Sequence, residues 1–129
     1  MEMTVTFAGG SRVQASFGSF AVETDQPQAH GGDGSAPTPF ELFMASLATC
    51  AGYYVLGFCK TRGISAEGIS LIQKSEQQEK TRLVEKVTLE IHLPPDFPEQ
   101  YKAAVIKAAE SCLVKKHLEH PPSFEIITI

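Results

Sequence analysis

The stretch that decides the fold is TPFELFMASLATCAGYYVLGFCKTRG, residues 38–63. Thr38 fits the N-cap of a helix, Pro39 its first position, and Glu41 the third residue of a capping box. Basic residues near the end and Gly63 after them are typical of a helix terminus. The stretch therefore predicts a single helix of about 24 residues, roughly 36 Å long.

The middle of this helix raises the question of a membrane span. Residues 42–59 carry no charge, and 18 residues just reach the length needed to cross a bilayer. Serine, threonine, glycine and tyrosine dilute the run, and a helix that is apolar all round can also be the centre of a globular core. We therefore predict a core helix. Because one small sheet cannot cover it on all sides, we expect a second subunit to complete its burial in a homodimer.

Strands are predicted on both sides of the helix. Apolar and polar residues alternate over 3–7, 13–17 and 20–24, which predicts an antiparallel meander with glycine-centred turns. Residues 25–37 are dense in glycine, proline and polar residues and predict a long loop. Residues 69–93 predict a second strand pair with a charged hairpin tip.

The C-terminal third predicts helices and a closing strand. After Pro94 and Pro95, a helix carries an inward apolar stripe that ends in Cys112. Residues 113–119 predict a further helix, and SFEIITI, residues 123–129, predicts a final strand. The order of elements indicates an α+β fold in one domain, residues 1–129.

Composition limits the classes of function. A chain of 129 residues that is 43% hydrophobic and 20% charged can bury a core, which excludes intrinsic disorder. The net charge of −4 speaks against nucleic acid or an anionic membrane as a partner. An odd cysteine count and a start without the pattern of a secretory leader favour the cytoplasm, where disulfides are transient.

The three cysteines are the candidate chemical groups. Phosphate-binding loops, HExxH and CxxC are missing, and the histidines lack metal-ligand spacing, so we expect neither a metal nor an organic cofactor. Cys50 and Cys59 are nine residues apart on one helix, about 13.5 Å along its axis, and cannot bridge. Cys112 is then the intrachain partner left for Cys50. The alternative is that all three are small buried hydrophobic residues.

Two segments carry a family resemblance. APTPFELFMASLATC, residues 36–50, and AAESCLVKKHLE, residues 108–119, resemble the superfamily of osmotically inducible protein C (OsmC) and the organic hydroperoxide resistance (Ohr) proteins. The resemblance extends over essentially the whole chain. It implies an OsmC-like α+β fold and an intertwined homodimer in which two long central helices pack inside two sheets.

The resemblance also implies a thiol-dependent peroxidase for organic hydroperoxides. Cys50, as a thiolate, would attack the peroxide and become a sulfenic acid, which Cys112 would resolve as a disulfide. An external dithiol would then reduce the pair. Burial opposes ionisation of a thiol, and the family uses an arginine oriented by a glutamate to overcome this cost. The candidate for this arginine is Arg12, on the polar face of the second predicted strand. The candidate for the glutamate is Glu41.

Two positions depart from the family pattern. The acidic residue of the best-known peroxidases lies ten positions before the nucleophile, where this chain has Phe40, whereas Glu41 lies at nine. A regular helix turns Glu41 away from Cys50, and its capping role alone explains the residue. Leu113 follows Cys112 where many relatives have proline. These departures point to a distinct subfamily.

Two other classes of function stay open at this point. One is a noncatalytic dimer that binds a hydrophobic small molecule while its cysteines remain inert. The other is a redox-sensing or partner-binding module whose shape changes when a disulfide forms.

Overall fold

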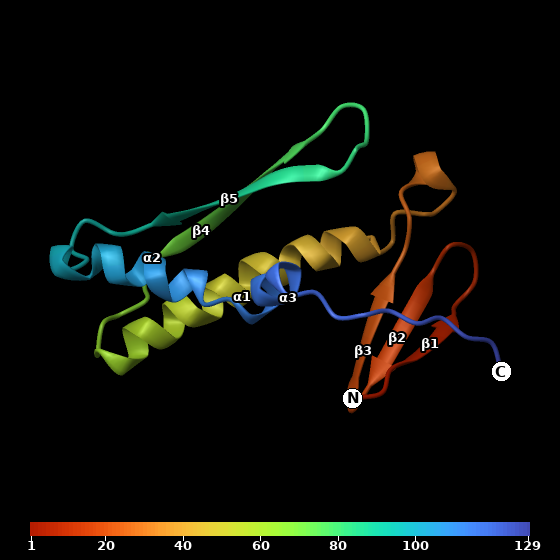
Figure 1. The fold of residues 1–129 in the computed structure, drawn as a ribbon, viewed down its shortest axis with the longest axis horizontal. Coiled ribbons are helices and arrows are strands. Elements are labelled where there is room, and N and C mark those ends of the chain that lie inside the picture. Colours follow the sequence, from red (N-terminus) through yellow and green to blue (C-terminus); the bar gives the residue numbers. More distant parts are fainter. The chain divides into compact units, whose positions relative to one another are not determined.

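The computed structural model describes all of residues 1–129 and divides them into two compact units, Met1–Ala45 and Ser46–Ile129. The long helix α1, Pro39–Thr61, begins in the first unit and continues through the second (Figure 1). Each unit is described by itself. The assignment of the chain to one domain stays a prediction.

The first unit contains the predicted meander. Strands β1 (Thr4–Phe7), β2 (Val13–Phe17) and β3 (Phe20–Thr24) form an antiparallel sheet in the order β1-β2-β3. The alternation of apolar and polar residues therefore predicted these strands to within one residue.

The loop after β3 is organised around a buried carboxylate. Asp25 is only 1% exposed. Its carboxylate accepts the backbone N–H groups of Gln26 (2.8 Å), Asp33 (3.3 Å) and Ser35 (3.0 Å), and the Ser35 hydroxyl at 2.6 Å. The Ser35 hydroxyl, followed by these amides, lowers the pKa of Asp25 to about 2. The loop is thus ordered by one anion.

Two close approaches make the same loop compact. The backbone N–H of Asp25 donates to the Pro37 carbonyl at 3.2 Å, which joins the two ends of the loop. A Cβ at Gly32 would lie 1.9 Å from the Gln26 carbonyl oxygen, so only glycine fits there. The short 3₁₀ helix η1, Gln28–His30, lies between these contacts. The loop predicted for residues 25–37 is confirmed, and it delivers the chain to the start of α1.

Both ends of α1 follow the sequence signals. The backbone N–H of Thr38 donates to Glu41 Oε2 at 2.8 Å, and the Glu41 N–H donates to Thr38 Oγ1 at 3.2 Å, which is a capping box. At the other end Gly63 has a φ of 65°, and the Ile64 N–H returns to the Cys59 carbonyl at 2.9 Å. The predicted helix is confirmed.

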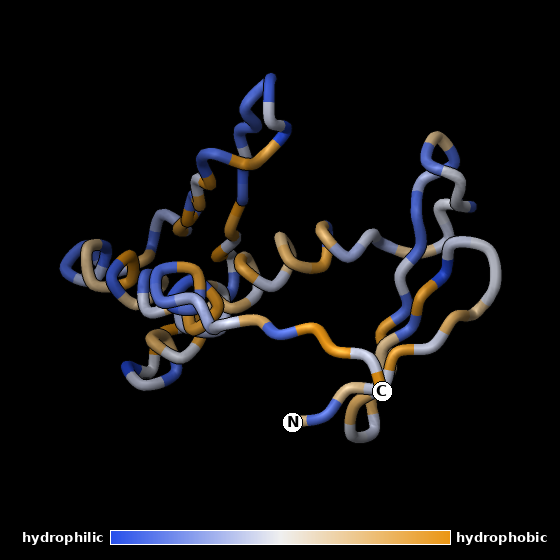
Figure 2. Tube along the Cα trace, turned by 45° about the vertical axis from the view of Figure 1, so that its right-hand side comes forward, coloured by the Kyte–Doolittle hydropathy of each residue, from blue (hydrophilic) through white to orange (hydrophobic).

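The second unit adds a hairpin and two short helices. Strands β4 (Ser70–Gln77) and β5 (Val84–His92) pair antiparallel, and Figure 2 shows the hydrophilic tip of their hairpin. The 3₁₀ helix η2 (Glu99–Tyr101) leads into α2 (Lys102–Glu110), and α3 (Leu113–Glu119) follows.

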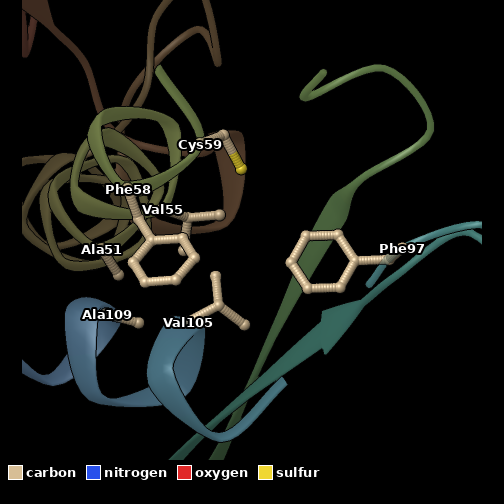
Figure 3. Packing of buried hydrophobic residues seen from close by; sticks show 7 residues of the cluster. All are labelled: Ala51, Val55, Phe58, Cys59, Phe97, Val105 and Ala109. Carbon is tan, nitrogen blue, oxygen red and sulfur yellow. The ribbon is translucent and has the colours of Figure 1, made fainter. Parts of the chain in front are cut away.

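One face of α1 and the inner face of α2 form the core of this unit. Figure 3 shows the Phe97 ring facing Val55, Cys59 and Val105. Cys59 and Val105 are 0% exposed. Full burial of a valine side chain stabilises a fold by about 1.5–3 kcal/mol, so this contact fixes α2 against α1.

The closing strand is the main error of the sequence prediction. Residues 121–129 carry no regular secondary structure, and the side chains of Phe124 and Ile126 are 87% and 97% exposed. A strand needs a neighbouring strand to pair its backbone groups, and neither sheet of this chain offers one to the segment. Alternation of apolar residues predicts the extended form but supplies no pairing partner.

Helix α1 is long and apolar enough to cross a membrane by length and composition alone. That test is weak evidence, because the core helix of a soluble protein also passes it. Its buried residues pack into the core of the second unit: Ala51, Val55, Phe58 and Cys59. This packing shows the predicted core role for one face of α1, while only 22% of its most apolar 18-residue window is buried within the single chain.

Candidate functional site

Cys50 and Cys112 meet within the second unit. Cys50 lies on α1 and is half-buried, whereas Cys112 is only 2% exposed. The sequence predicted Cys112 on the inward stripe of the second helix. That prediction is wrong, because α2 ends at Glu110. It lies in the bend after α2, with φ −49° and ψ 120°, and is the N-cap of α3.

The Cys112 sulfur is held between α3 and α1. Its Sγ accepts the backbone N–H of Lys115 at 3.4 Å, in the manner of a capping side chain. Its Sγ lies 4.0 Å from the Leu47 carbonyl oxygen of α1. Because Leu47 is one helical turn before Cys50, this contact places Cys112 beside the turn that carries Cys50.

Groups of the same bend affect the ionisation of Cys50. Burial raises the pKa of Cys50, while the backbone N–H of Val114, the Cys112 thiol and the backbone N–H of Leu113 lower it. The hydrogen bonds outweigh burial, so the pKa of Cys50 lies below that of an ordinary cysteine. These donors are backbone amides and a thiol, and no cationic side chain is among them.

Cys112 has the opposite tendency. Burial raises the pKa of its thiol, and the neighbouring Cys50 raises it further, while the Lys115 N–H opposes both. The pair is therefore divided into one sulfur that ionises readily and one that holds its proton. This division is the one that a nucleophile and a resolving thiol require.

Cys59 belongs to the core. It is 0% exposed, and burial raises the pKa of its thiol. All three cysteines are present as free thiols.

Arg12 and Glu41 belong to the first unit. Arg12 precedes β2 instead of lying on its polar face, and its guanidinium donates to the carbonyl oxygens of Ala8 (3.0 Å) and Gly9 (3.4 Å). The Glu41 carboxylate is engaged in the capping box with Thr38. Local contacts thus account for both side chains, and their catalytic roles stay predictions.

An apolar cavity of about 640 Å³ adjoins the cysteine pair. Cys112 lines it together with Leu47 and Ala51, which flank Cys50 along α1. Most of its apolar wall comes from aliphatic side chains of β5 and α2, among them Leu89, Ile91 and Ile106. The charged residues Lys102, Glu110 and Lys115 also line it. The cavity is large enough for a small organic molecule.

Sequence reasoning missed the groups that act on Cys50. The donors from Leu113 and Val114 are backbone amides, which any residue except proline supplies, so no side-chain pattern reveals them. Leu113 itself gives only a weak signal, because it has the backbone N–H that a proline at this position would lack. The Asp25 cluster was missed as well, although an acidic residue before a glycine-rich loop is typical of such turns.

Comparison with known proteins gives the family. The family model described as OsmC-like protein matches residues 32–127, about three quarters of the chain. The chain belongs to the OsmC-like family. No curated protein matches it.

Solved structures share the OsmC-like fold with this chain. A protein of Psychrobacter arcticus named for osmotic stress induction and detoxification response is 23% identical, with a TM-score of 0.74, over 88% of this chain and 85% of its own. An organic hydroperoxide resistance protein OsmC of Legionella pneumophila is 24% identical, with a TM-score of 0.60, over 92% and 89%.

The OhrB protein of Bacillus subtilis, an organic hydroperoxide resistance protein, is 21% identical, with a TM-score of 0.53, over 91% of this chain and 90% of its own. At these identities the likeness establishes the fold. The OsmC-like fold that the resemblance implied is confirmed.

Proposed function

We propose that this OsmC-like chain is a thiol-dependent peroxidase that reduces organic hydroperoxides. The observation that carries the proposal is the contact between Cys50, with its lowered pKa, and Cys112, with its raised pKa, beside an apolar cavity. Family membership and neighbours named for organic hydroperoxide resistance support a peroxide-related redox role.

The reaction balances with these two sulfurs and one external reductant. The Cys50 thiolate attacks the terminal peroxide oxygen, so that an S–O bond forms and the O–O bond breaks. The alkoxide leaves, takes a proton and becomes an alcohol, and Cys50 becomes a sulfenic acid. The Cys112 thiol then attacks the Cys50 sulfur, a disulfide forms, and water leaves. A dithiol reduces this disulfide by exchange, and no metal or organic cofactor enters.

The cavity fits the organic part of such a substrate. Its aliphatic wall would contact the alkyl chain of a hydroperoxide. Because Cys112 lines the cavity, the peroxide group would then lie near the two cysteines. From the family resemblance alone, Arg12 and Glu41 are proposed as the arginine and the glutamate that assist catalysis.

We further propose a cytoplasmic homodimer. Helix α1 exposes large apolar side chains in the single chain, including Phe40 (50%), Tyr53 (69%) and Leu56 (39%). Water disfavours exposed apolar side chains of this size, and a second copy of the chain would cover them. Sedimentation equilibrium should give twice the mass of the chain, and a monomer at micromolar concentration would contradict this part of the proposal.

A turnover assay tests the function. Reduced protein with an alkyl hydroperoxide and excess dithiothreitol should consume peroxide over many cycles. Cys50→Ser should reduce this consumption to the uncatalysed rate, whereas Cys59→Ser should retain it. Equal consumption by the wild type and by Cys50→Ser would overturn the proposal.

The cavity also favours a second candidate, a module that binds a hydrophobic small molecule without catalysis. Binding of an apolar dye that is unchanged in Cys50→Ser, together with absent turnover in the wild type, would select this candidate.

A further inference from the structure

Helix α3 depends on the contacts at its ends, because little of it packs into the core. None of its seven residues is buried, and an isolated helix of this length is marginal in water. Cys112 is its N-cap: the Cys112 Sγ accepts the backbone N–H of Lys115 at 3.4 Å, and the Cys112 carbonyl accepts that of Lys116 at 3.1 Å. The Lys115 N–H belongs to the first turn, where a helix offers no carbonyl partner. The first turn of α3 therefore depends on where the Cys112 sulfur lies.

The same sulfur lies beside the turn of α1 that carries Cys50. The Cys112 Sγ is 4.0 Å from the Leu47 carbonyl oxygen, and Leu47 precedes Cys50 by one helical turn. A disulfide allows only a narrow range of bond length and torsion. Once bonded to Cys50, the position of the Cys112 sulfur would be set by α1 and no longer by the Lys115 N–H.

We propose that Cys112 is a redox switch for α3: as a free thiol it caps the helix, and in a disulfide with Cys50 it leaves the cap, so that the first turn of α3 loosens. The inference rests on the proposed disulfide, and it goes further because it gives the oxidised chain a different structure at α3. Lys115 and Leu118 line the apolar cavity together with Cys112, so the loosened turn lies in the cavity wall. Loosening would open to a dithiol a cysteine that is only 2% exposed as a thiol.

The other contacts of α3 favour such a switch. The ammonium of Lys115 lies 3.4 Å from Glu119 in an exposed pair, and His117 Nδ1 lies 2.8 Å from the Leu113 carbonyl oxygen. Both contacts act within α3, so neither ties its first turn to α1. Oxygen-bearing side chains are the usual N-caps. The sulfur that stands here is the kind of capping atom that oxidation to a disulfide can withdraw.

Amide exchange with water, measured by NMR at Lys115 and Lys116 in the full chain, tests the switch. Reduced protein is compared with protein treated with diamide, which takes two electrons and two protons from the two thiols and becomes a hydrazine. Peptide mapping verifies the disulfide. Loss of the cap should quicken exchange at both amides roughly fivefold in the oxidised chain. Cys112→Ala lacks the cap and should show this faster exchange already when it is reduced.

Two control variants separate the cap from the treatment. Cys112→Ser keeps a capping side chain, so its exchange should stay within about twofold of the reduced wild type. Cys50→Ser keeps the Cys112 cap and removes its disulfide partner, so diamide should leave the exchange of α3 unchanged. The comparison of the two redox states of the wild type needs no substitution.

The outcomes distinguish this inference from the proposed function. Unchanged or slower exchange in a chain whose Cys50–Cys112 disulfide is mapped would overturn the switch and leave the peroxidase proposal standing. Unchanged exchange in reduced Cys112→Ala would overturn the switch as well. Absent peroxide turnover, together with the expected exchange, would overturn the peroxidase proposal alone. Failure of diamide to join Cys50 and Cys112 would overturn both.

Discussion

Asp25 and Cys50 are two acidic side chains whose charged forms are held by backbone amides. Asp25 accepts three amides and the Ser35 hydroxyl. At Cys50, burial raises the pKa, and the backbone N–H groups of Val114 and Leu113 and the Cys112 thiol lower it. The pKa of each is lowered. They differ in access, because Asp25 is 1% exposed and Cys50 is only half-buried. Stabilisation of a charged side chain thus orders a loop at Asp25, which is enclosed. At Cys50, which stays accessible, it leaves a reactive group.

The largest expected effect comes from removing the resolving sulfur, Cys112, from the proposed redox pair. In Cys112→Ser the serine hydroxyl still donates to Cys50 but cannot form a disulfide. One equivalent of an alkyl hydroperoxide should therefore leave a stable Cys50 sulfenic acid, which dimedone labels nearly completely. The wild type should show almost no label, because Cys112 reacts first.

Cys50→Ser is the control for this labelling and should give none. Label on Cys59 in any variant would contradict the distinction between the reactive and the core cysteine.

The next largest effect is expected from a substitution of Asp25, the enclosed carboxylate. Asp25→Ala removes the acceptor of three backbone amides and leaves these donors without their partner. Hydrogen exchange at the Asp33 and Ser35 amides should quicken by roughly tenfold or more, since each loses a bond to a charged group. In the wild type this protection should be complete above the ordinary pKa of 3.8 and decline as pH falls through about 2. Unchanged exchange in Asp25→Ala would show that the carboxylate does not order the loop.

The prediction of the fold from sequence succeeded where the deciding information is local. The capping box of Thr38 and Glu41 and the glycine after α1 fix that helix, and alternation fixes the strands of both sheets. It failed for residues 123–129, because strand pairing depends on a partner that the segment itself does not specify.

The candidate site was predicted only in part. The sequence identified Cys50 and Cys112 as a pair, because helix spacing excludes a bridge between Cys50 and Cys59 and because the family resemblance implies the same pair. It did not predict that Cys112 lies in a bend whose amides reach Cys50, because backbone donors depend on φ and ψ and not on side-chain type. The sequence therefore suggested a cation at Arg12 for a task in which backbone amides take part.

A smaller effect is expected in the way that Cys50 makes the stability of the fold depend on pH. The folded pKa of Cys50 lies below the ordinary value of 9.0, so its contribution to stability is complete above that value. The contribution is lost as pH falls through the folded pKa. The difference in unfolding free energy between the wild type and Cys50→Ser should therefore grow as pH rises toward 9.0. Urea unfolding under reducing conditions measures it, and a difference that shrinks over this range would contradict the lowered pKa.

The smallest effect is expected from removing a single hydrogen-bond donor to Asp25. Ser35→Ala removes the hydroxyl that bonds to Asp25 at 2.6 Å but keeps all three amides. Exchange at the Asp33 amide should quicken only about two- to fivefold, as expected for one bond among four. An effect as large as that of Asp25→Ala would mean that the hydroxyl, and not the amides, orders the loop.

The central claim is that Cys50 and Cys112 form the redox pair of this chain. Its most direct test is peptide mapping without reduction, after the fully reduced protein has met one equivalent of an alkyl hydroperoxide. The account predicts a disulfide between Cys50 and Cys112, with Cys59 recovered as a free thiol. Recovery of all three thiols, or a disulfide that includes Cys59, would contradict it.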